Sequence, residues 1–428
     1  MKYIPLFTII IATTLSSCVP ASTTSNNSTK QLTFNNWDYE PYVGMVQVYP
    51  TSADPQASLE DPITPLGSQG FTCKFDLLIA DAEYLKAKYV HCNADWTRST
   101  LSDIQYMNQY NEFDLDTYDF SANTRELYVH YQASLPLPTI SGNYLLKVYR
   151  DGNEQDLVLT RRLVVYENRT TVSASIKSSN AVVNRRANHQ INFSVKYDPQ
   201  TNLRPMQDLH MVILQNHDWN TAIRDLQPTL TRPDQGYLEY HHLTGENEFP
   251  GLKEFRFFDL RSVDYRGMNV AHIIKEEKGI SAQLMLDKSR HSLAYTQLNE
   301  DINGDFFLQN HDPNDTYLES EYVKVNFRLE SEPLSGEVYI RGKFNNWNLT
   351  PQNQMHYNPN TRTYEGQLLL KQGYYNYCYW VLADNLPVDA LEGSHYQTEN
   401  SYEVLVYYRD PANNYDEVVG YRQLLSGN

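Results

Sequence analysis

Short runs of alternating apolar and polar residues recur along the whole chain, whereas the periodicity of an amphipathic helix is scarce. The runs are rich in β-branched and aromatic residues and are broken by Asn, Asp, Gly and Pro. An alternation with a period of two places every second side chain on the same face of a strand. The pattern therefore predicts an all-β protein made of several sandwich-like or barrel-like domains.

The predicted strands fall into three blocks, at residues 31–167, 168–314 and 315–428. In the first block, an Asp-Gly pair at Asp151 and Gly152 separates two strand-like runs, which is a strong hairpin signal. The clearest strands of the three blocks are expected at residues 45–49, 71–79, 85–91, 127–132, 144–149 and 157–165, then 190–197, 210–215, 253–259 and 281–286, and finally 322–329, 336–341, 363–370, 373–382 and 402–408.

The N-terminus has the pattern of an export signal. A basic start and an apolar stretch that is too short to span a bilayer end in Leu-Ser-Ser before Cys18. This resembles the bacterial lipobox, which implies that residues 1–17 are a lipoprotein signal peptide and that Cys18 is lipidated. The alternative is an ordinary signal peptide with a chance cysteine. Residues 18–30 are polar and predict a flexible tether, and Val19 in place of Asp implies the periplasmic face of the outer membrane.

Composition narrows the class of partner. The 428-residue chain has a formal net charge of −17, which argues against nucleic acid and against direct binding to anionic lipid. It contains 34 tyrosines, a residue that suits both sheet surfaces and protein interfaces.

Three cysteines follow Cys18. Cys73 and Cys92 fall on two strands predicted to be neighbours and are a candidate disulfide in an exported protein, which leaves Cys378 unpaired. No two of these cysteines have the spacing of a zinc site.

No catalytic or cofactor motif stands out. The sequence has no nucleophile elbow, no zinc-protease motif and no phosphate-binding glycine loop. Residues 301–305 resemble a calcium loop but lack its distal Glu, so a turn is expected there. Carboxylates are numerous enough that a hydrolase with an unrecognised acid–base pair stays open. We expect no enzyme activity, metal or cofactor.

One specific pattern lies in the third block. Residues 342–347 read Gly-Lys-Phe-Asn-Asn-Trp, which resembles a turn of the starch- and glycogen-binding early-set sandwich modules. The resemblance implies a candidate sugar site at Trp347, with Trp380 as a second platform. The alternative is that Trp347 fixes the turn against the domain and that Trp380 belongs to the core.

Three segments together resemble one family: residues 91–96, residues 141–149 with their continuation at 156–162, and residues 341–347. Their order and spacing are similar to those of the plug protein of the type IX secretion system, over essentially the whole mature chain. The resemblance implies tandem immunoglobulin-like or early-set β-sandwich domains in the periplasm. It also implies a protein that closes the outer-membrane translocon barrel by protein–protein contact.

Two alternatives to this plug function stay open at the level of sequence. One is a carbohydrate-binding lipoprotein that uses Trp347 and Trp380, and the other is the hydrolase. For the plug, the loops at residues 50–70 and 96–118 are the candidate contact elements, by their length and aromatic content.

Overall fold

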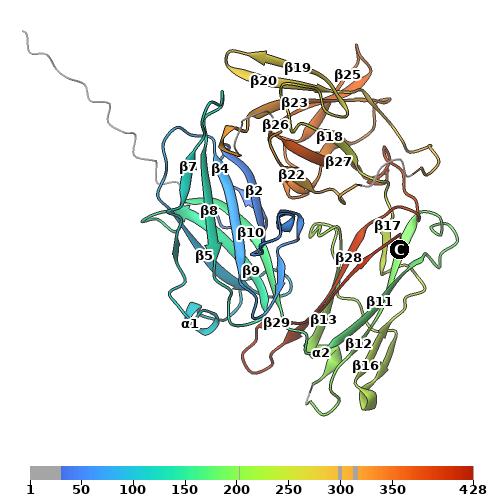
Figure 1. Ribbon diagram of the computed structural model, residues 1–428. Coiled ribbons are helices and arrows are strands. Elements are labelled where there is room, and N and C mark those ends of the chain that lie inside the picture. The colour runs from blue at the N-terminus through green and yellow to red at the C-terminus, as the bar shows by residue number, and fades with distance from the viewer. Residues whose placement is uncertain (1–29, 202, 297–300, 312–316, 428) are drawn as a thin grey trace, which may run out of the picture.

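Three β lobes make up the protein (Figure 1). The computed structural model describes residues 30–201, 203–296, 301–311 and 317–427. In Figure 1 the first lobe, in blue and teal, lies at the left, the third, in yellow and orange, at the upper right, and the second, in green with two red strands, at the lower right. The prediction of an all-β fold with several sandwich domains is confirmed.

The first lobe is a sandwich of two sheets. One sheet has the order β1-β10-β9-β5-β6, with β3 parallel to β10, and the other has the order β2-β4-β8-β7. The predicted hairpin at Asp151 and Gly152 is confirmed, because it joins β9 to β10. The elements of the first lobe are β1 (Trp37–Asp38), β2 (Val43–Pro50), η1 (Ala57–Leu59), β3 (Ile63–Pro65), β4 (Phe71–Leu77), β5 (Leu85–Cys92), α1 (Asp103–Tyr106), β6 (Phe113–Asp114), β7 (Tyr118–Phe120), β8 (Val129–Leu135), β9 (Gly142–Arg150) and β10 (Leu157–Tyr166).

Strand β9 explains why the sequence of this lobe is more apolar than simple alternation. Tyr144, Leu146 and Val148 point into the sandwich core, and Leu145 belongs to a second cluster shared with the next lobe. Both faces of the strand are therefore buried, as expected for a sheet that is covered on both sides.

The second lobe is completed by strands from the end of the chain. One sheet has the order β11-β12-β16-β15, with β17 beside β12, and the other has the order β14-β13-β28-β29. Its elements are β11 (Thr171–Ser178), β12 (Asn188–Lys196), α2 (Pro205–Asp208), β13 (Leu209–Gln215), β14 (Ile223–Arg224), β15 (Leu230–Arg232), η2 (Pro233–Gln235), β16 (Tyr237–Tyr240), β17 (Glu248–Pro250), β28 (Ser401–Arg409) and β29 (Asp416–Leu425).

The third lobe is inserted between β17 and β28. Its strands follow the order β18-β27-β24-β25-β26-β23-β20-β19, with β21 beside β23 and β22 beside β27. Its elements are β18 (Arg256–Asp259), β19 (Val270–Glu276), β20 (Gly279–Leu284), β21 (Asp287–Lys288), β22 (Phe306–Leu308), η3 (Tyr317–Glu319), β23 (Tyr322–Glu330), β24 (Glu337–Arg341), η4 (Lys343–Asn345), β25 (Gln354–Asn358), β26 (Thr363–Lys371) and β27 (Gly373–Leu382).

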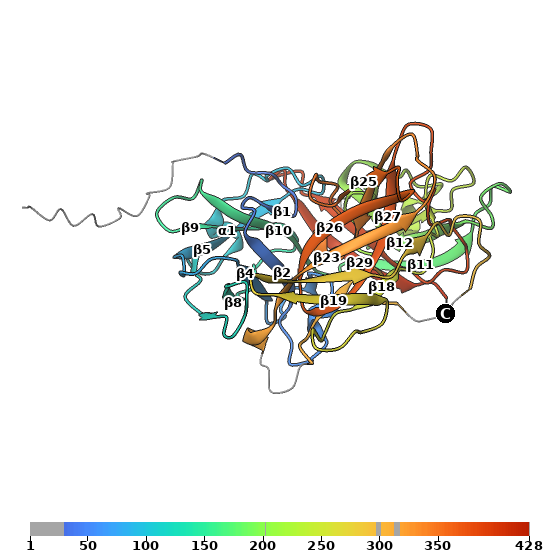
Figure 2. The same cartoon turned by 90° about the horizontal axis from the view of Figure 1, so that it is seen from above.

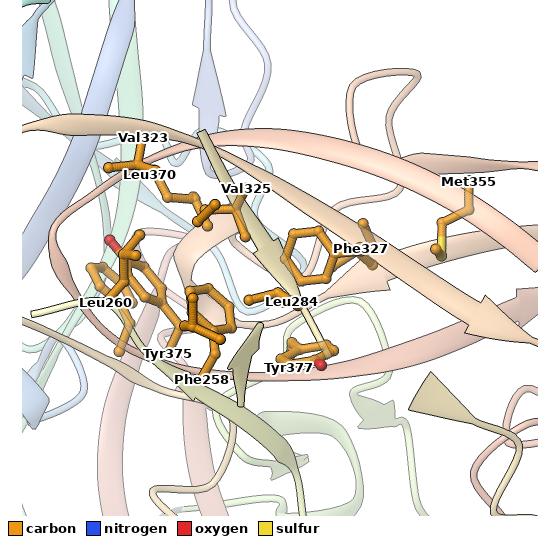
Figure 3. Packing of buried hydrophobic residues seen from close by; sticks show 14 of the residues in the cluster. Phe258, Leu260, Leu284, Val323, Val325, Phe327, Met355, Leu370, Tyr375 and Tyr377 are labelled. Carbon is orange, nitrogen blue, oxygen red and sulfur yellow. The ribbon is translucent and has the colours of Figure 1, made fainter. Parts of the chain in front are cut away.

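Figure 3 shows the core of the third lobe. Aromatic rings of Phe258, Phe327, Tyr375 and Tyr377 pack together there with aliphatic side chains from the facing strands. The same cluster includes Met45 from the first lobe, so the two lobes share buried apolar surface.

The strand pairing differs from the predicted blocks after residue 167. Strand β28 pairs with β13 of the second lobe and β29 pairs with β28, whereas β18 and β22 pair with β27 of the third lobe. The boundary predicted at residue 314 does not follow this pairing, because strand pairing between distant segments leaves no local signal in the sequence.

The predicted disulfide is also not formed. Cys73, Cys92 and Cys378 are buried free thiols. Cys73 lies on β4 inside the first sandwich, whereas Cys92 lies on β5 of the opposite sheet and belongs to the cluster shared with the second lobe. The expectation failed because the two strands are consecutive in the chain but belong to different sheets.

Candidate functional site at the junction of the lobes

A buried polar cluster lies where the three lobes meet. The first lobe contributes Asp61 from the segment after η1. The second contributes His217 from the turn after β13 and Glu403 from β28, and the third contributes Lys343 and Asp305. These charged and polar side chains are therefore the first candidate for a catalytic or metal-binding site.

A tight turn after β13 positions the histidine. Asn216 and His217 both have left-handed backbones, with φ of 50° and 55°. The Asn216 carboxamide accepts a hydrogen bond from the Ser401 amide at 2.9 Å and donates one to Asn400 at 2.8 Å. The turn is thus held against the start of β28, which carries Glu403.

Lys343 binds two carboxylates at once. Its Nζ lies 2.7 Å from Asp61 Oδ1 and 2.8 Å from Asp305 Oδ2. Burial raises the pKa of Asp61, but Lys343 and His217 outweigh that effect and hold it below the usual value. Burial lowers the pKa of Lys343, but the two carboxylates hold it above the usual range. The ammonium therefore stays charged and joins the first lobe to the third.

When the His217 ring is neutral, its hydrogen bonds select one tautomer. The indole Nε1 of Trp219 lies 3.3 Å from His217 Nε2, and an indole N–H can only donate. Nε2 is therefore the acceptor, and Nδ1–H donates to Glu403 Oε2 at 2.7 Å. The other oxygen of Glu403 accepts a hydrogen bond from Tyr421 at 2.9 Å.

The set of Asp61, His217 and Glu403 has the ligand types of a metal site, with ligand atoms within 4.8 Å of one another. However, the residues do not fit a metal ion. A metal on Nδ1 would move the ring proton to Nε2, directly against the N–H of Trp219. Asp61 is also already neutralised by Lys343. The cluster is better described as an internal ion-pair network.

The space beside this network is small. The cavity lined by Gln47, Asp61, Arg162, Lys343 and Trp347 has a volume of about 90 Å³. Small-molecule sites usually have about 300–1,000 Å³. The cavity has room for ordered water but not for a substrate of ordinary size.

Trp347 and Trp380 form a second contact at the junction, through Arg341. The guanidinium lies 4.1 Å above the Trp380 ring and pairs with Asp218 at 2.7 Å, while its Nε donates to the Trp347 carbonyl at 2.8 Å. Trp347 is only 6% exposed and packs on Phe255.

This arrangement differs from the open platform expected at these two residues. Trp347 is buried, and one face of Trp380 is covered by Arg341. In the turn at residues 342–347, Trp347 packs the third lobe against its neighbours.

The first and second lobes meet through aromatic residues. Trp96 and Trp219 pack edge to face at 4.9 Å, and the Arg162 guanidinium lies 4.5 Å above Trp96. Tyr407 of β28 donates to Asn143 of β9 at 2.9 Å. Trp96 belongs to one of the segments that carried the family resemblance, and its role here is to join lobes.

The first and third lobes meet through a buried ion pair. Lys371 Nζ is 2.8 Å from Asp76 Oδ2, and the same carboxylate accepts hydrogen bonds from Tyr322 at 2.7 Å and contacts His130 at 2.7 Å. Burial raises the pKa of Asp76, but Lys371 and His130 outweigh it and hold the pKa below the usual value. The carboxylate remains ionised and the seam stays closed.

A third region bears on the hydrolase alternative. Glu254 and Asp301 line a cavity of about 270 Å³. Burial raises the pKa of Asp301 to about 7. Yet its two oxygens accept backbone N–H groups of Phe255 and Asn303, and Glu254 accepts the Tyr295 hydroxyl at 2.5 Å. Both carboxylates are held by the protein itself, and Asp301 lies in the turn that the sequence predicted at residues 301–305.

The two predicted contact loops have different positions. In the segment at residues 50–70, Ala57 is buried and Asp61 belongs to the polar cluster, whereas residues 52–56 are exposed. In the segment at residues 96–118, Trp96 is buried between lobes, whereas Ile104 and Tyr110 are exposed.

Sequence analysis missed the residues of the polar cluster, although one signal was present. Glu403 stands within an apolar run, Tyr-Glu-Val-Leu-Val-Tyr, and Lys371 ends a run of three leucines. A charged residue at a buried strand position requires a partner. The partners come from other lobes, so the sequence alone does not identify them.

The candidate lipidation residue Cys18 lies outside the described residues. Among the described residues, no helix is long and apolar enough to cross a membrane.

Comparison with known proteins gives two matches. The family model described as "Type 9 secretion system plug protein 1st domain" matches residues 43–167, which run from β2 to β10 of the first lobe. The crystal structure of a hypothetical protein from Parabacteroides merdae ATCC 43184 is similar with a TM-score of 0.85 and 30% sequence identity, over 92% of this chain and 100% of that one. No curated protein sequence matches the chain.

Proposed function

Because the chain belongs to the plug protein family of the type 9 secretion system, we propose that it seals the translocon barrel of that system in the outer membrane. The family is a non-catalytic part of the secretion machinery and is associated with its outer-membrane components. The finer proposal is that this protein binds the periplasmic end of the barrel directly and closes it when no cargo occupies it.

The observation that carries this proposal is the way the lobes are joined. Buried ion pairs at Lys343 and Lys371 join the first lobe to the third, and the aromatic contact of Trp96 with Trp219 joins the first to the second. The ion pair of Arg341 with Asp218 joins the second to the third. A body that covers a wide aqueous pore must keep its shape under load. A rigid body also loses little conformational entropy when it docks.

The N-terminus supports a proposal for the location of the protein. We propose that Cys18 carries a lipid on the periplasmic face of the outer membrane and that residues 18–30 are the tether. A tether would raise the local concentration beside the barrel, so that a modest affinity would be enough for closure and release.

Co-purification tests the partner. The tagged full-length protein would be captured from outer membranes solubilised in a mild detergent, and the bound proteins would be identified by mass spectrometry. We expect the giant translocon barrel among them. Its absence, in cells that produce it, would contradict the proposal.

A variant separates the lipid from the barrel. Cys18→Ser should lose its membrane association in cells that lack the barrel and keep its co-purification where the barrel is present. If Cys18→Ser stays with the membrane in both strains, the proposed anchor is wrong and the proposed barrel contact is unaffected.

The carbohydrate-binding alternative has less support. The burial of Trp347 removes one of the two stacking surfaces on which that alternative was based, and Arg341 covers one face of the other, Trp380. No observation at the junction favours a second function.

A further inference from the structure

Strand β7 of the first lobe has an open edge. It pairs with β8 at residues 118–120 and ends the sheet order β2-β4-β8-β7. Within the described part of the chain, no strand pairs with its other side. Both views show the first lobe at one end of the molecule, with β8 well away from β11 and β12 of the second lobe (Figures 1 and 2). Residues 116–120 are all exposed, so the open edge faces solvent.

A hydrogen bond to β8 shows which backbone groups of this segment point outward. The Gln132 N–H donates to the Thr117 carbonyl at 3.0 Å, so Thr117 faces β8. In an antiparallel pair, the residues that exchange hydrogen bonds with a given neighbour alternate along the strand. Tyr118 and Phe120 therefore direct their N–H and C=O groups away from β8, where another strand can pair with them.

The hairpin formed by β7 and β8 is fixed to the third lobe at its tip. The Ala122 N–H donates to the Leu318 carbonyl at 3.0 Å, and the Arg125 guanidinium binds Glu321 at 2.7 Å. A strand edge that is already held in place loses little conformational entropy when a partner docks on it. Arg125 is the one arginine or lysine between β7 and β8, and its charge is taken by Glu321.

Two aromatic side chains extend the core of the first lobe to this edge. The Tyr118 ring lies 5.6 Å from that of Tyr131, which belongs to the core, and 5.9 Å from that of Phe120. Phe120 is nevertheless 53% exposed. A segment that pairs with β7 would cover this surface, which favours apolar side chains on the same face of the segment.

Carboxylates on the same segment define the charge of the partner. Asp116 and Asp119 are exposed, and neither side chain forms an ion pair or a hydrogen bond with any residue that the structure describes. Lys86, on the adjoining sheet, is engaged by Glu112 at 2.7 Å. Charges on an edge strand guard it against a second copy of the same chain, because like charges would then lie opposite each other. The same charges attract a basic segment.

We propose that the open edge of β7 binds an extended basic segment of a partner protein, which adds to the sheet as a strand. Successive side chains of a strand point to opposite faces, so Asp119 lies on the other face from Tyr118 and Phe120. The segment therefore carries Lys or Arg opposite Asp119, between two apolar residues that cover the aromatic rings. This site goes beyond the proposed plug function and does not depend on it.

A peptide-display experiment tests the site. The full-length protein is used to select from a random twelve-residue peptide library, and the most enriched peptide is synthesised with a fluorophore. We expect enriched sequences in which Lys or Arg stands between two apolar residues. Binding of the synthesised peptide is then measured by fluorescence anisotropy.

Two matched variants locate the binding edge. Asp119→Lys reverses the charge at the open edge and should weaken binding of this peptide by at least about tenfold, because like charges then lie opposite each other. Asp234→Lys reverses another exposed carboxylate, in η2 of the second lobe, and should bind like the original protein. A peptide with Glu in place of its Lys or Arg should prefer Asp119→Lys to the original protein.

Backbone methylation tests the strand pairing. Two versions of the peptide are N-methylated at alternate residues, one in each register. The version whose methyl groups face β7 should fail to bind, whereas the version whose methyl groups point away should keep its affinity, because an added strand pairs through alternate N–H groups.

Four results would overturn the proposal. The first is a selection that enriches no peptide, or only peptides without Lys or Arg. The second is a peptide that binds Asp119→Lys and the original protein equally. The third is equal binding by both N-methylated peptides. The fourth is a concentration-dependent dimer of the original protein, seen by analytical ultracentrifugation, that Asp119→Lys disrupts, because the edge would then serve a second copy of this chain.

Discussion

Glu392 shows how single residues hold the third lobe together. Its carboxylate contacts Arg256 Nε at 2.9 Å and Arg290 at 2.7 Å, and it accepts the Tyr379 amide at 3.0 Å. Burial raises the pKa of Glu392, but the two guanidinium groups outweigh it and lower the pKa to about 2 from an ordinary value of 4.5. The carboxylate is thus more acidic in the folded protein than in the unfolded chain.

Stability should therefore depend on pH through this residue. A carboxyl with a depressed folded-state pKa contributes stability above its unfolded pKa, and that contribution is lost as the pH falls through the folded pKa. The contribution of Glu392 is expected to be full above about pH 4.5 and to disappear towards pH 2, with a size on the order of 3 kcal/mol.

Urea unfolding at several pH values measures this effect. Glu392→Gln should be less stable than the original protein at pH 7 and should lose less stability between pH 4.5 and pH 2. Glu277→Gln, at an exposed site, should follow the original protein throughout. Parallel curves for Glu392→Gln and the original protein would show that the residue does not carry this pH dependence.

At the scale of elements, the insertion of the third lobe determines which fragments can fold. Strand β28 pairs with β13, and its Tyr402, Val404 and Val406 belong to the core of the second lobe. Strand β27 pairs with β18, and strand β23 pairs with β20. A fragment that starts after residue 314 would therefore leave three strands without their partners.

Expression of two fragments tests this topology. Residues 315–428, which the sequence suggested as one domain, should give no cooperative unfolding transition and little dispersion in an amide NMR spectrum. Residues 168–428 contain every strand of the second and third lobes and should unfold cooperatively. A well-folded 315–428 fragment would contradict the strand order described here.

Elements could be predicted from the sequence where their causes are local. The runs at residues 363–370 and 373–382 correspond to β26 and β27, and the Asp151-Gly152 turn joins the strands beside it, because alternation and turn chemistry act over a few residues. The pairing of β13 with β28 joins residues almost two hundred positions apart and has no local cause.

The same limit explains the errors at the candidate site. The motif around Trp347 predicted a turn correctly, but the sequence could not tell that Phe255 and Arg341 would cover the ring. Likewise, the pairing of Cys73 with Cys92 assumed that consecutive strands are neighbours, whereas they lie in different sheets.

At the scale of the whole molecule, the chain is three sandwiches joined by buried contacts. The first lobe contacts the second through Trp96 and Trp219, and the third through Asp76 and Lys371. Charged groups buried in such seams stabilise a structure only when both partners are present. Separation of two lobes would expose or orphan these groups, so the lobes are expected to move as one body.

We expect this single body to seal a pore. Envelope permeability to a large hydrophilic antibiotic should be compared in cells with the gene, without it, and with it restored, while the type 9 translocon is present but secretes no cargo. Uptake should rise on deletion, return on re-expression, and stay low in cells that also lack the barrel. Unchanged uptake after deletion, with the barrel confirmed in the outer membrane, would show that the protein does not seal it.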